Sequence, residues 1–446
     1  MRCSCRIFGR IWPVAAGLML AVEHPGLARE PADAAKLLQA AHVATDEEGL
    51  LKFLRQQIPT TSESARLDEL VRQLGAASFT VRERACVEAI ALGPKAVHRL
   101  QQALKDGDPE VRTRTQRCLE GIQRGPGRAL DLAAIRLVKE KTLPHALGGL
   151  LDYLPFAMDD GVAQEALSAM AAIVTHGNVN HSELTTALHD RSPQRRAAAA
   201  FLLAKIAVER PDLRQLLSDP DPEVRLRCAQ GLLEAGDLGV VAQLISWTNS
   251  GPPVLADRAE DVLAWLADGE TPVAPMTRDD AARQRRHDAW AAWWKANEEH
   301  FQLPTTEPDP LIDLQALSAR RAAQQFVNAL GKGQEGLAMD MMGAPFLYKF
   351  GRHNSVLEFG RVTRRLRAEY RMLRPSEQSA KITGVAEGSE YAERATPSER
   401  DFLRCFPIGQ IRIVTVTLPE RGRSQERIFF VYLGADRPRI VGYGYG

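Results

Sequence analysis

The stretch LSDPDPEVRLRCAQGLLEAG, residues 217–236, has the pattern of a helix with marked ends. An Asp-Pro pair precedes the helix: an Asp side chain accepts hydrogen bonds from free N–H groups of the first turn, and proline has no N–H to lose there. Val224, Cys228 and Leu232 follow at four-residue spacing and form one apolar stripe. Gly236 ends the pattern. One such helix cannot bury its stripe alone, so the stretch predicts packing against similar neighbours.

Similar stretches recur along the chain. The string DPEVR occurs at residues 108–112 and again at residues 221–225. In a further copy, DRSPQRRAAAAFLLAKI, Arg195 lies thirty residues before Arg225. An earlier copy begins at Ser78, and a looser copy begins at Pro253. Repetition at this period predicts helix pairs that stack on their neighbours and form an α-solenoid.

These stretches resemble the HEAT-repeat family, and especially the HEAT proteins that are abundant in planctomycete-type bacteria. The resemblance covers about residues 65–303 and includes LVRQLGAASFTVRERACVEAIALG from Leu70, GGLLDYLPFAMDDGVAQEAL from Gly148 and RHDAWAAWWKANEEHFQL from Arg286. It implies a mainly α fold, a HEAT-type α-solenoid with a binding or scaffolding role, and it implies no catalytic residues. Residues 129–180 depart from the short repeat, so the number of repeats there stays open.

The pattern changes after a Pro- and acid-containing linker, residues 304–314. We expect three helices, at about residues 317–330, 335–342 and 355–372. Alternating β-branched residues then predict strands at 379–386, at 411–418, from Arg427 and at the C-terminus. Helices followed by an antiparallel sheet argue for a small α+β domain, residues 315–446.

This order of elements resembles the NTF2-like, or SnoaL-like, cone fold. The resemblance rests on ARRAAQQFVNALGKGQEGLAMDMMGAPFLY, from Ala319, followed by a helix and long strands. It implies a curved sheet wrapped around helices, with a cavity that binds small molecules in some members, catalyses reactions in a few and mediates association in many. No set of cavity residues from that family maps onto this sequence.

The first residues have the layout of a secretory signal. A basic stretch precedes the apolar run Ile11–Val22, and small residues follow at Gly26 and Ala28. The run is shorter than the roughly 20 residues that a membrane-spanning helix needs. We therefore expect a signal peptide at residues 1–28, export to the periplasm or cell envelope or secretion, and no transmembrane segment after its removal. Residues 29–64 form a predicted N-terminal helical or linker segment.

The overall charge is balanced, with 57 lysines and arginines against 56 acidic residues. No global field therefore attracts nucleic acid or an anionic membrane, and we expect no nucleic-acid partner. The expected partner is a protein or peptide on the solenoid surface. The oligomeric state stays open.

Cys86, Cys118 and Cys228 fall within the repeat helices, where a thiol usually serves as a small core residue. An oxidising compartment permits a bridge between Cys86 and Cys118 if their two helices face each other. Spacing alone leaves both states open, two free thiols or one disulfide.

Three histidines and two aspartates come nearest to a chemical site: His176, His181, His189, Asp159 and Asp160. The histidine spacings match neither a metalloprotease helix nor a structural zinc site, so we interpret them as structural or loop residues. The aspartates lie in PFAMDDG, where turn formation and helix capping are natural roles. The sequence also contains no Gly-rich phosphate loop, GxSxG elbow or CxxCH haem site. We therefore predict no catalytic residue, no metal site and no cofactor.

Trp290, Trp293 and Trp294 share one face of a predicted helix. We interpret them as a bulky core stripe that closes the end of the solenoid, because terminal repeats commonly cap such arrays. The alternative is an aromatic stacking surface for single-stranded nucleic acid beside three arginines. These are Arg283, Arg285 and Arg286.

A basic segment, FGRVTRRLRAEYRMLR, lies within the third predicted helix of the C-terminal domain. An apolar stripe through Val362 and Leu366 indicates that its arginines project outward. They form either an ordinary solvated face or a face for an anionic partner. The residues are Arg361, Arg364, Arg365, Arg367, Arg371 and Arg374.

An aromatic cluster precedes that segment at Phe346, Tyr348 and Phe350. They are either ordinary core or the lining of a cavity in the C-terminal domain.

These observations favour a non-enzymatic protein-binding scaffold or adaptor of the cell envelope that acts through HEAT repeats. The alternative is small-ligand binding, or an enzymatic activity, in the cavity of the C-terminal domain. An enzyme would need a polar group with a shifted pKa that points into an apolar pocket.

Overall fold

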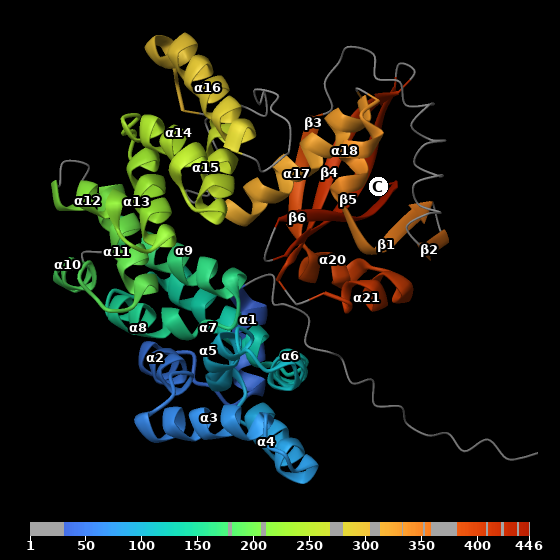
Figure 1. Cartoon of the computed structure of the whole chain (residues 1–446). Helices are drawn as coiled ribbons and strands as arrows, with labels where there is room; N and C mark the ends of the chain where they lie inside the picture. Colours follow the sequence, from blue (N-terminus) through green and yellow to red (C-terminus); the bar gives the residue numbers. More distant parts are fainter. Residues whose placement is uncertain are drawn as a thin grey trace, which may run out of the picture.

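The computed structural model describes residues 31–446 except 177–180, 207–210, 268–279, 304–312, 332, 351–352, 358–380, 407–408, 421–422, 435–436 and 446. A helical array comes first and a domain with one β-sheet follows (Figure 1). This order confirms the predicted fold class, a mainly α array followed by a small α+β domain. The predicted signal peptide, residues 1–28, lies outside the described residues.

The array consists of helices joined by short loops. They are α1 (Pro31–Ala40), α2 (Glu47–Gln56), α3 (Thr61–Leu74), α4 (Phe79–Ala91), α5 (Pro94–Ala103), α6 (Pro109–Gln123), α7 (Gly127–Lys141), α8 (Ala146–Tyr153), α9 (Asp160–His176), α10 (Ser182–Ala187), α11 (Pro193–Ile206), α12 (Pro211–Gln215), α13 (Pro222–Glu234), α14 (Val240–Ser250), α15 (Pro253–Leu266) and α16 (Asp280–Asn297). Three short 3₁₀ turns accompany them, η1 (Leu154–Phe156), η2 (Leu216–Ser218) and η3 (Glu298–His300).

The Asp-Pro pairs start helices as the sequence predicts. Asp108 and Asp221 are the N-caps of α6 and α13, and each carboxylate accepts a hydrogen bond from a backbone N–H of the first turn, at 2.8 and 2.9 Å. The proline after each cap occupies the first turn, where its missing N–H costs nothing. After α13, Gly236 adopts φ +92°, a left-handed conformation that favours glycine.

An arginine at the fourth position of a helix ties a repeat to the loop before it. Arg82, Arg112 and Arg196 each donate from Nη1 to the carbonyl oxygens six and five residues earlier, at 2.6–3.2 Å. Arg225 is likewise the fourth residue of α13. The alignment of Arg195 with Arg225 is therefore wrong by one residue, because Arg196 holds the equivalent position in α11.

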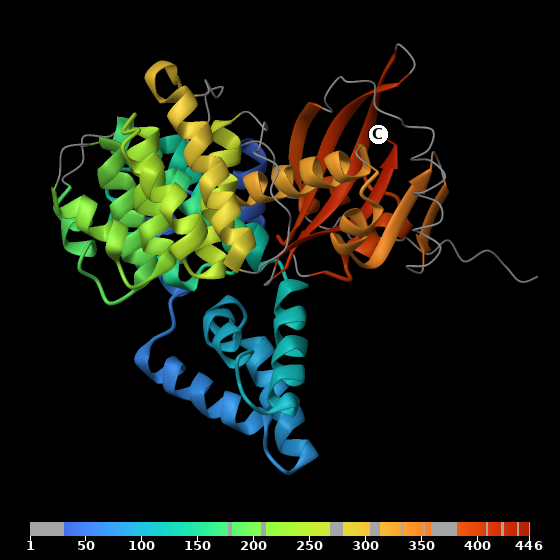
Figure 2. The ribbon, with the colours of Figure 1, turned by 45° about the horizontal axis from the view of Figure 1, so that its top comes forward.

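The array contains two apolar clusters. Helices α3 to α6 enclose one of them, around residues such as Leu74, Cys86 and Leu100. The other extends through α1, α2 and α7 to α16. Figure 2 shows α3 and α4 projecting away from the rest of the molecule. The predicted solenoid over residues 65–303 is therefore divided into a projecting four-helix unit, α3–α6, and a main array.

The first two helices belong to the main array. Leu38 of α1 and Leu50 and Leu54 of α2 are buried in its cluster, where α1 packs on α7 and α2 packs on α8. The stretch predicted as a separate helical or linker segment, residues 29–64, therefore includes core helices. The irregular region 129–180 contains α7, α8 and α9, and α7 packs between α1 and α9.

The C-terminal domain is built on one six-stranded sheet, ordered β2-β1-β6-β5-β4-β3. Strands β1 and β6 are parallel, and all other neighbours are antiparallel. The elements are α17 (Leu314–Gly331), α18 (Glu335–Asp340), β1 (Met342–Phe350), β2 (His353–Leu357), β3 (Lys381–Glu387), α20 (Gly388–Arg394), α21 (Pro397–Leu403), β4 (Ile411–Glu420), β5 (Arg423–Leu433) and β6 (Pro438–Tyr445).

Helices cover both faces of this sheet. On one face, Phe429 and Val431 pack against α17 and α18. On the other, Ile428 and Phe430 pack against Phe402 of α21 and its neighbours. This alternation follows from the two-residue period of a strand.

Four predicted strands are found at or near their expected positions, whereas several helix predictions are wrong in part. The helix expected to start near Ser355 is wrong at that end, because β2 covers His353–Leu357, and residues 358–372 lie outside the described residues. The helix expected at 335–342 ends at Asp340, and β1 begins at Met342. The helices α20 and α21 were not expected.

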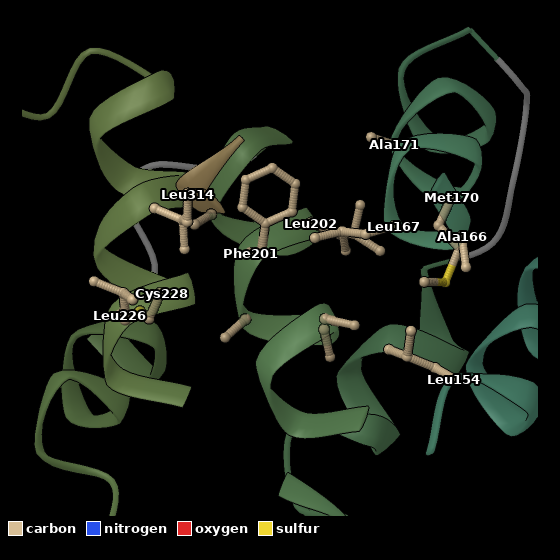
Figure 3. Close-up of a cluster of buried hydrophobic side chains, with 14 of the residues drawn as sticks. Leu154, Ala166, Leu167, Met170, Ala171, Phe201, Leu202, Leu226, Cys228 and Leu314 are labelled. Atoms are coloured by element: carbon tan, nitrogen blue, oxygen red, sulfur yellow. The ribbon is translucent and has the colours of Figure 1, made fainter. Parts of the chain in front are cut away.

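Helix α17 contributes to two cores. Its first residues, Leu314 and Leu317, belong to the apolar cluster of the main array, and Figure 3 shows Leu314 with Phe201, Leu226 and Cys228. From Ala319 onward the same helix packs on the sheet. The helix begins at Leu314, three residues before the expected start, and so links the two parts of the molecule without an intervening loop.

We predict that Phe326→Ala destabilises both parts of the chain. Phe326 is fully buried between α17 and the sheet, and removal of its ring should cost about 3–5 kcal/mol. Five of the six tryptophans lie in helices of the array and the sixth is Trp12 of the predicted signal, so tryptophan fluorescence does not report the sheet domain. Because α17 is shared, the Tm measured by tryptophan fluorescence should fall.

The control is Gln324→Ala at a partly exposed position of the same helix, which should leave the Tm nearly unchanged. An unchanged tryptophan transition in Phe326→Ala, with an earlier transition in the far-UV circular dichroism, would show that the two parts unfold independently.

Candidate functional site

A buried ion cluster joins the array to the sheet domain. Arg128 of α7 donates from Nε to Asp159 Oδ2 at 2.6 Å and from Nη2 to Glu387 Oε2 at 3.4 Å. Asp159 also accepts a hydrogen bond from the N–H of Val162 at 3.0 Å and so caps α9. Glu387 is the last residue of β3. One guanidinium therefore holds a carboxylate from each part of the molecule.

Two glycines allow this close approach. A Cβ at Gly161 would lie 2.9 Å from Arg128 Nη2 and 3.1 Å from Glu387 Oε1. At Gly409, where φ is +82°, a Cβ would lie 3.3 Å from the carboxyl carbon of Asp159. The absence of these side chains leaves room for the ion cluster.

A second polar connection joins α15 to α17. Arg321 bonds to Asp261, and its Nη1 lies 3.0 Å from Glu260 Oε2. Ser318 donates to Asp261, and Arg258 Nη1 donates to Ser318 Oγ at 2.8 Å. Burial disfavours the charged form of Arg321, but the adjacent carboxylates of Asp261 and Glu260 hold its pKa above the ordinary value. The charges and hydrogen-bonding groups of these side chains are therefore paired across the junction.

A buried carboxyl of the array, Asp131, has a raised pKa. It is fully buried in α7, and its Oδ2 accepts a hydrogen bond from the Tyr153 hydroxyl at 2.8 Å. Burial raises the pKa of Asp131 to about 7, against the opposing effect of the Tyr153 hydrogen bond. Since Asp131 has no exposed surface, a substrate cannot reach it. We interpret it as a structural proton-binding group.

The aspartates in PFAMDDG thus have the predicted structural role and a further one. Asp159 caps a helix and binds Arg128. The Asp160 carboxylate accepts a hydrogen bond from Gln315 Nε2 of α17 at 2.7 Å. The sequence gives no sign of these partners, because Asp160 and Gln315 lie 155 residues apart.

The three histidines between residues 176 and 189 lie on the surface. His176, His181 and His189 are all exposed. In the part of the chain that the structure describes, no three His, Cys, Asp or Glu side chains gather as a metal site requires.

The tryptophans lie where a core stripe would place them. Trp290 and Trp294 are buried in the cluster of the main array, and Trp293 is partly buried. Edge contacts join Trp293 to Trp290 and to Phe301, with ring centroids 5.5 and 5.9 Å apart. The aromatic stacking surface is therefore largely covered.

The aromatic cluster of β1 lies in the core of the sheet domain. Phe346 and Tyr348 are 1% and 2% exposed, on the face that α17 covers. Nothing is described of the Phe350 side chain, and the arginines at 361, 364, 365, 367, 371 and 374 lie outside the described residues. An anionic-partner face and a ligand cavity in this domain stay predictions.

Among the described residues, the two most exposed large hydrophobic side chains lie on the projecting unit. Phe79 and Val87 of α4 are 62% and 66% exposed, and their spacing places them on one side of the helix. The guanidinium carbons of Arg82 and Arg114 lie 5.8 and 5.6 Å from the centre of the Phe79 ring. Between the two apolar residues, Glu83 accepts a hydrogen bond from Arg114 Nη1 at 2.5 Å. We call this the α4–α6 face.

An open groove borders the same face. Its volume is about 530 Å³, and its lining combines cationic, neutral polar and acidic side chains with one leucine. These residues are Leu104, Arg112, Thr113, Gln116, Arg117 and Glu120. Arg117 belongs to both features, because its Nη1 lies 3.1 Å from Glu83 Oε1.

We predict that Asp159→Asn destabilises the protein through the ion cluster alone. Asparagine can still cap α9, but the charge that neutralises Arg128 is lost. Loss of one partner of a buried pair should cost about 2–4 kcal/mol in urea unfolding. Asp401→Asn, which removes an exposed pair with Arg404, is the control and should change stability by less than about 0.5 kcal/mol. Equal effects of the two changes would contradict a structural role for the cluster.

We predict that Asp131→Asn changes the pH dependence of stability. The pKa of Asp131 is higher in the folded protein than in the unfolded chain, so the folded state binds the proton more tightly. Wild-type stability relative to the variant should therefore fall as pH rises from about 4 to about 7, by on the order of a few kcal/mol, and then level off. Urea unfolding across this range measures the difference, and a constant difference would show that Asp131 does not titrate there.

Comparison with known proteins agrees with the helix pairs. Residues 182–264, which extend from α10 into α15, match the family model of HEAT repeats. No curated protein matches the chain. In the described residues, no helix has the length and apolar character needed to cross a bilayer. The match and the helical array together support a HEAT-repeat protein.

Proposed function

We propose that the protein is a non-enzymatic scaffold or adaptor of the cell envelope, exported by its N-terminal signal, which binds a protein or peptide partner through the α4–α6 face. HEAT repeats generally mediate protein–protein interaction, and stacked helix pairs provide extended binding surfaces. The buried groups with shifted pKa values, Asp131 and Arg321, bond to neighbouring side chains, and this supports a structural role for them. The signal layout of residues 1–28 supports export.

The exposed side chains of α4 carry this proposal. Phe79, Val87 and Val254 are the large hydrophobic residues most exposed in the described part of the chain. Two of them share one side of α4, next to the groove on α6. An aromatic ring among arginines, beside an aliphatic residue, is the composition of an interface hot spot.

The rest of the molecule can serve as a rigid support for this face. Shared helix α17 and the two polar connections fix the sheet domain on the main array. The projecting unit is attached to the main array through α5, where Gln101 Nε2 bonds to Met158 O at 3.3 Å and the His98 ring contacts Phe156. The α4–α6 face thus stays accessible.

The test is affinity capture of envelope proteins on the purified full chain, followed by Kd measurement with each reproducible partner. The double variant Phe79→Ser and Val87→Ser should weaken binding at least about tenfold, because loss of hot-spot side chains typically costs 2 kcal/mol or more. Val254→Ser is the matched control, since Val254 is 59% exposed on the distant α15. It should leave the Kd within about twofold.

Point variants are preferable to removal of the sheet domain. A truncation near Leu303 would delete Leu314 and Leu317 from the core of the array and destabilise it. If binding survives the double variant but is lost with Val254→Ser, the partner binds near Val254 and not at the α4–α6 face. No reproducible partner would contradict the scaffold proposal.

A further inference from the structure

A pair of thiols lies in the core of the projecting unit. Cys86 of α4 and Cys118 of α6 are both buried, with sulfur atoms 3.0 Å apart. The thiols are free in this structure. The side chains come from adjacent helix pairs, 32 residues apart in the sequence. The stacking of repeats therefore brings them together.

We propose that Cys86 and Cys118 form a disulfide that links α4 to α6. The two sulfurs already face each other, and a disulfide length of about 2.0 Å requires only a further approach of about 1 Å. The oxidant is a small-molecule or protein disulfide. The Sγ–Sγ bond forms as the S–S bond of the oxidant breaks, and the two thiol protons pass to its two sulfurs.

The other described cysteines lack such a partner. Cys228 is buried in α13, where its Sγ donates to Leu213 O at 3.1 Å. Cys405 is exposed, and its Sγ donates to Asp401 O at 3.6 Å. Each sulfur contacts a backbone carbonyl and not a second thiol, so the two cysteines serve as internal controls.

The environment favours bond formation before the core closes. A thiolate is needed for exchange, and burial together with the Cys86 contact raises the pKa of the Cys118 thiol well above its ordinary range. Once formed, the bond is shielded from reducing thiols by the same burial. It would keep α4 and α6 together beneath the α4–α6 face. This inference rests on the cysteine geometry and is independent of the proposed partner.

The experiment refolds the full chain in a buffer with excess oxidised glutathione, blocks free thiols with N-ethylmaleimide in denaturant, and digests with trypsin. Peptides ACVEAIALGPK (residues 85–95) and CLEGIQR (residues 118–124) should appear as one linked species that separates on reduction. Cys228 and Cys405 should carry the label or glutathione and should form no linked peptides. Alkylated Cys86 and Cys118, or glutathione attached to either, would overturn the proposal.

Two variants separate the bond from a packing effect. The oxidised wild type should have a Tm about 5 °C or more above that of the reduced protein, because the bond restricts the unfolded chain. Cys118→Ser should abolish both the linked peptides and this difference, whereas Cys405→Ser should retain both. If Cys118→Ser fails to fold, the peptide map of Cys405→Ser alone decides the outcome.

Discussion

Helix α17 has to satisfy two apolar cores at once, and the arrangement of the whole molecule depends on this constraint. Its first turn, with Leu314 and Leu317, lies among repeat helices, and its later turns lie on the sheet. A helix is a stiff connection, so the direction of α17 in one core determines where the other core lies. A flexible loop at this position would allow the two parts to rotate, as is common between domains.

The polar groups at the junction refine this arrangement without adding much stability. Taking Arg128 and its two carboxylates out of water costs energy that their attraction only partly returns. The pair of Arg128 with Glu387 crosses the junction, so a shift of the sheet would break it. Gly161 and Gly409 complete the fit, since side chains at these positions would enter the space of the cluster. Apolar contacts thus bring the parts together, and the charges select one orientation.

The projecting unit α3–α6 is organised differently. Its core is small and separate, and it reaches the main array through few contacts, such as the ring pair of His98 and Phe156. Small cores bury less apolar surface for each residue and are less stable on their own. A covalent link inside this core would compensate for its size. The same unit carries Phe79 and Val87, so its rigidity bears directly on recognition.

The sequence by itself determined the local structure of this protein. Asp108 and Asp221 with their prolines mark helix starts, the four-residue stripes mark buried faces, and alternation marks four of the strands, because these signals act between near neighbours. It could not predict that α1 and α2 join the main array or that β1 lies parallel to β6.

The candidate site was predictable only in its parts. Asp159 could be recognised as a helix cap, but its place beside Glu387 depends on residues 228 positions apart in the chain meeting in space. Likewise, the repeat places Cys86 and Cys118 in adjacent helix pairs, and only the packing of α4 on α6 brings their sulfurs together. An apolar stripe shows only that one face of a helix is buried. Which neighbour covers that face depends on the shape and charge of the complete fold, so these contacts were decided by the tertiary structure.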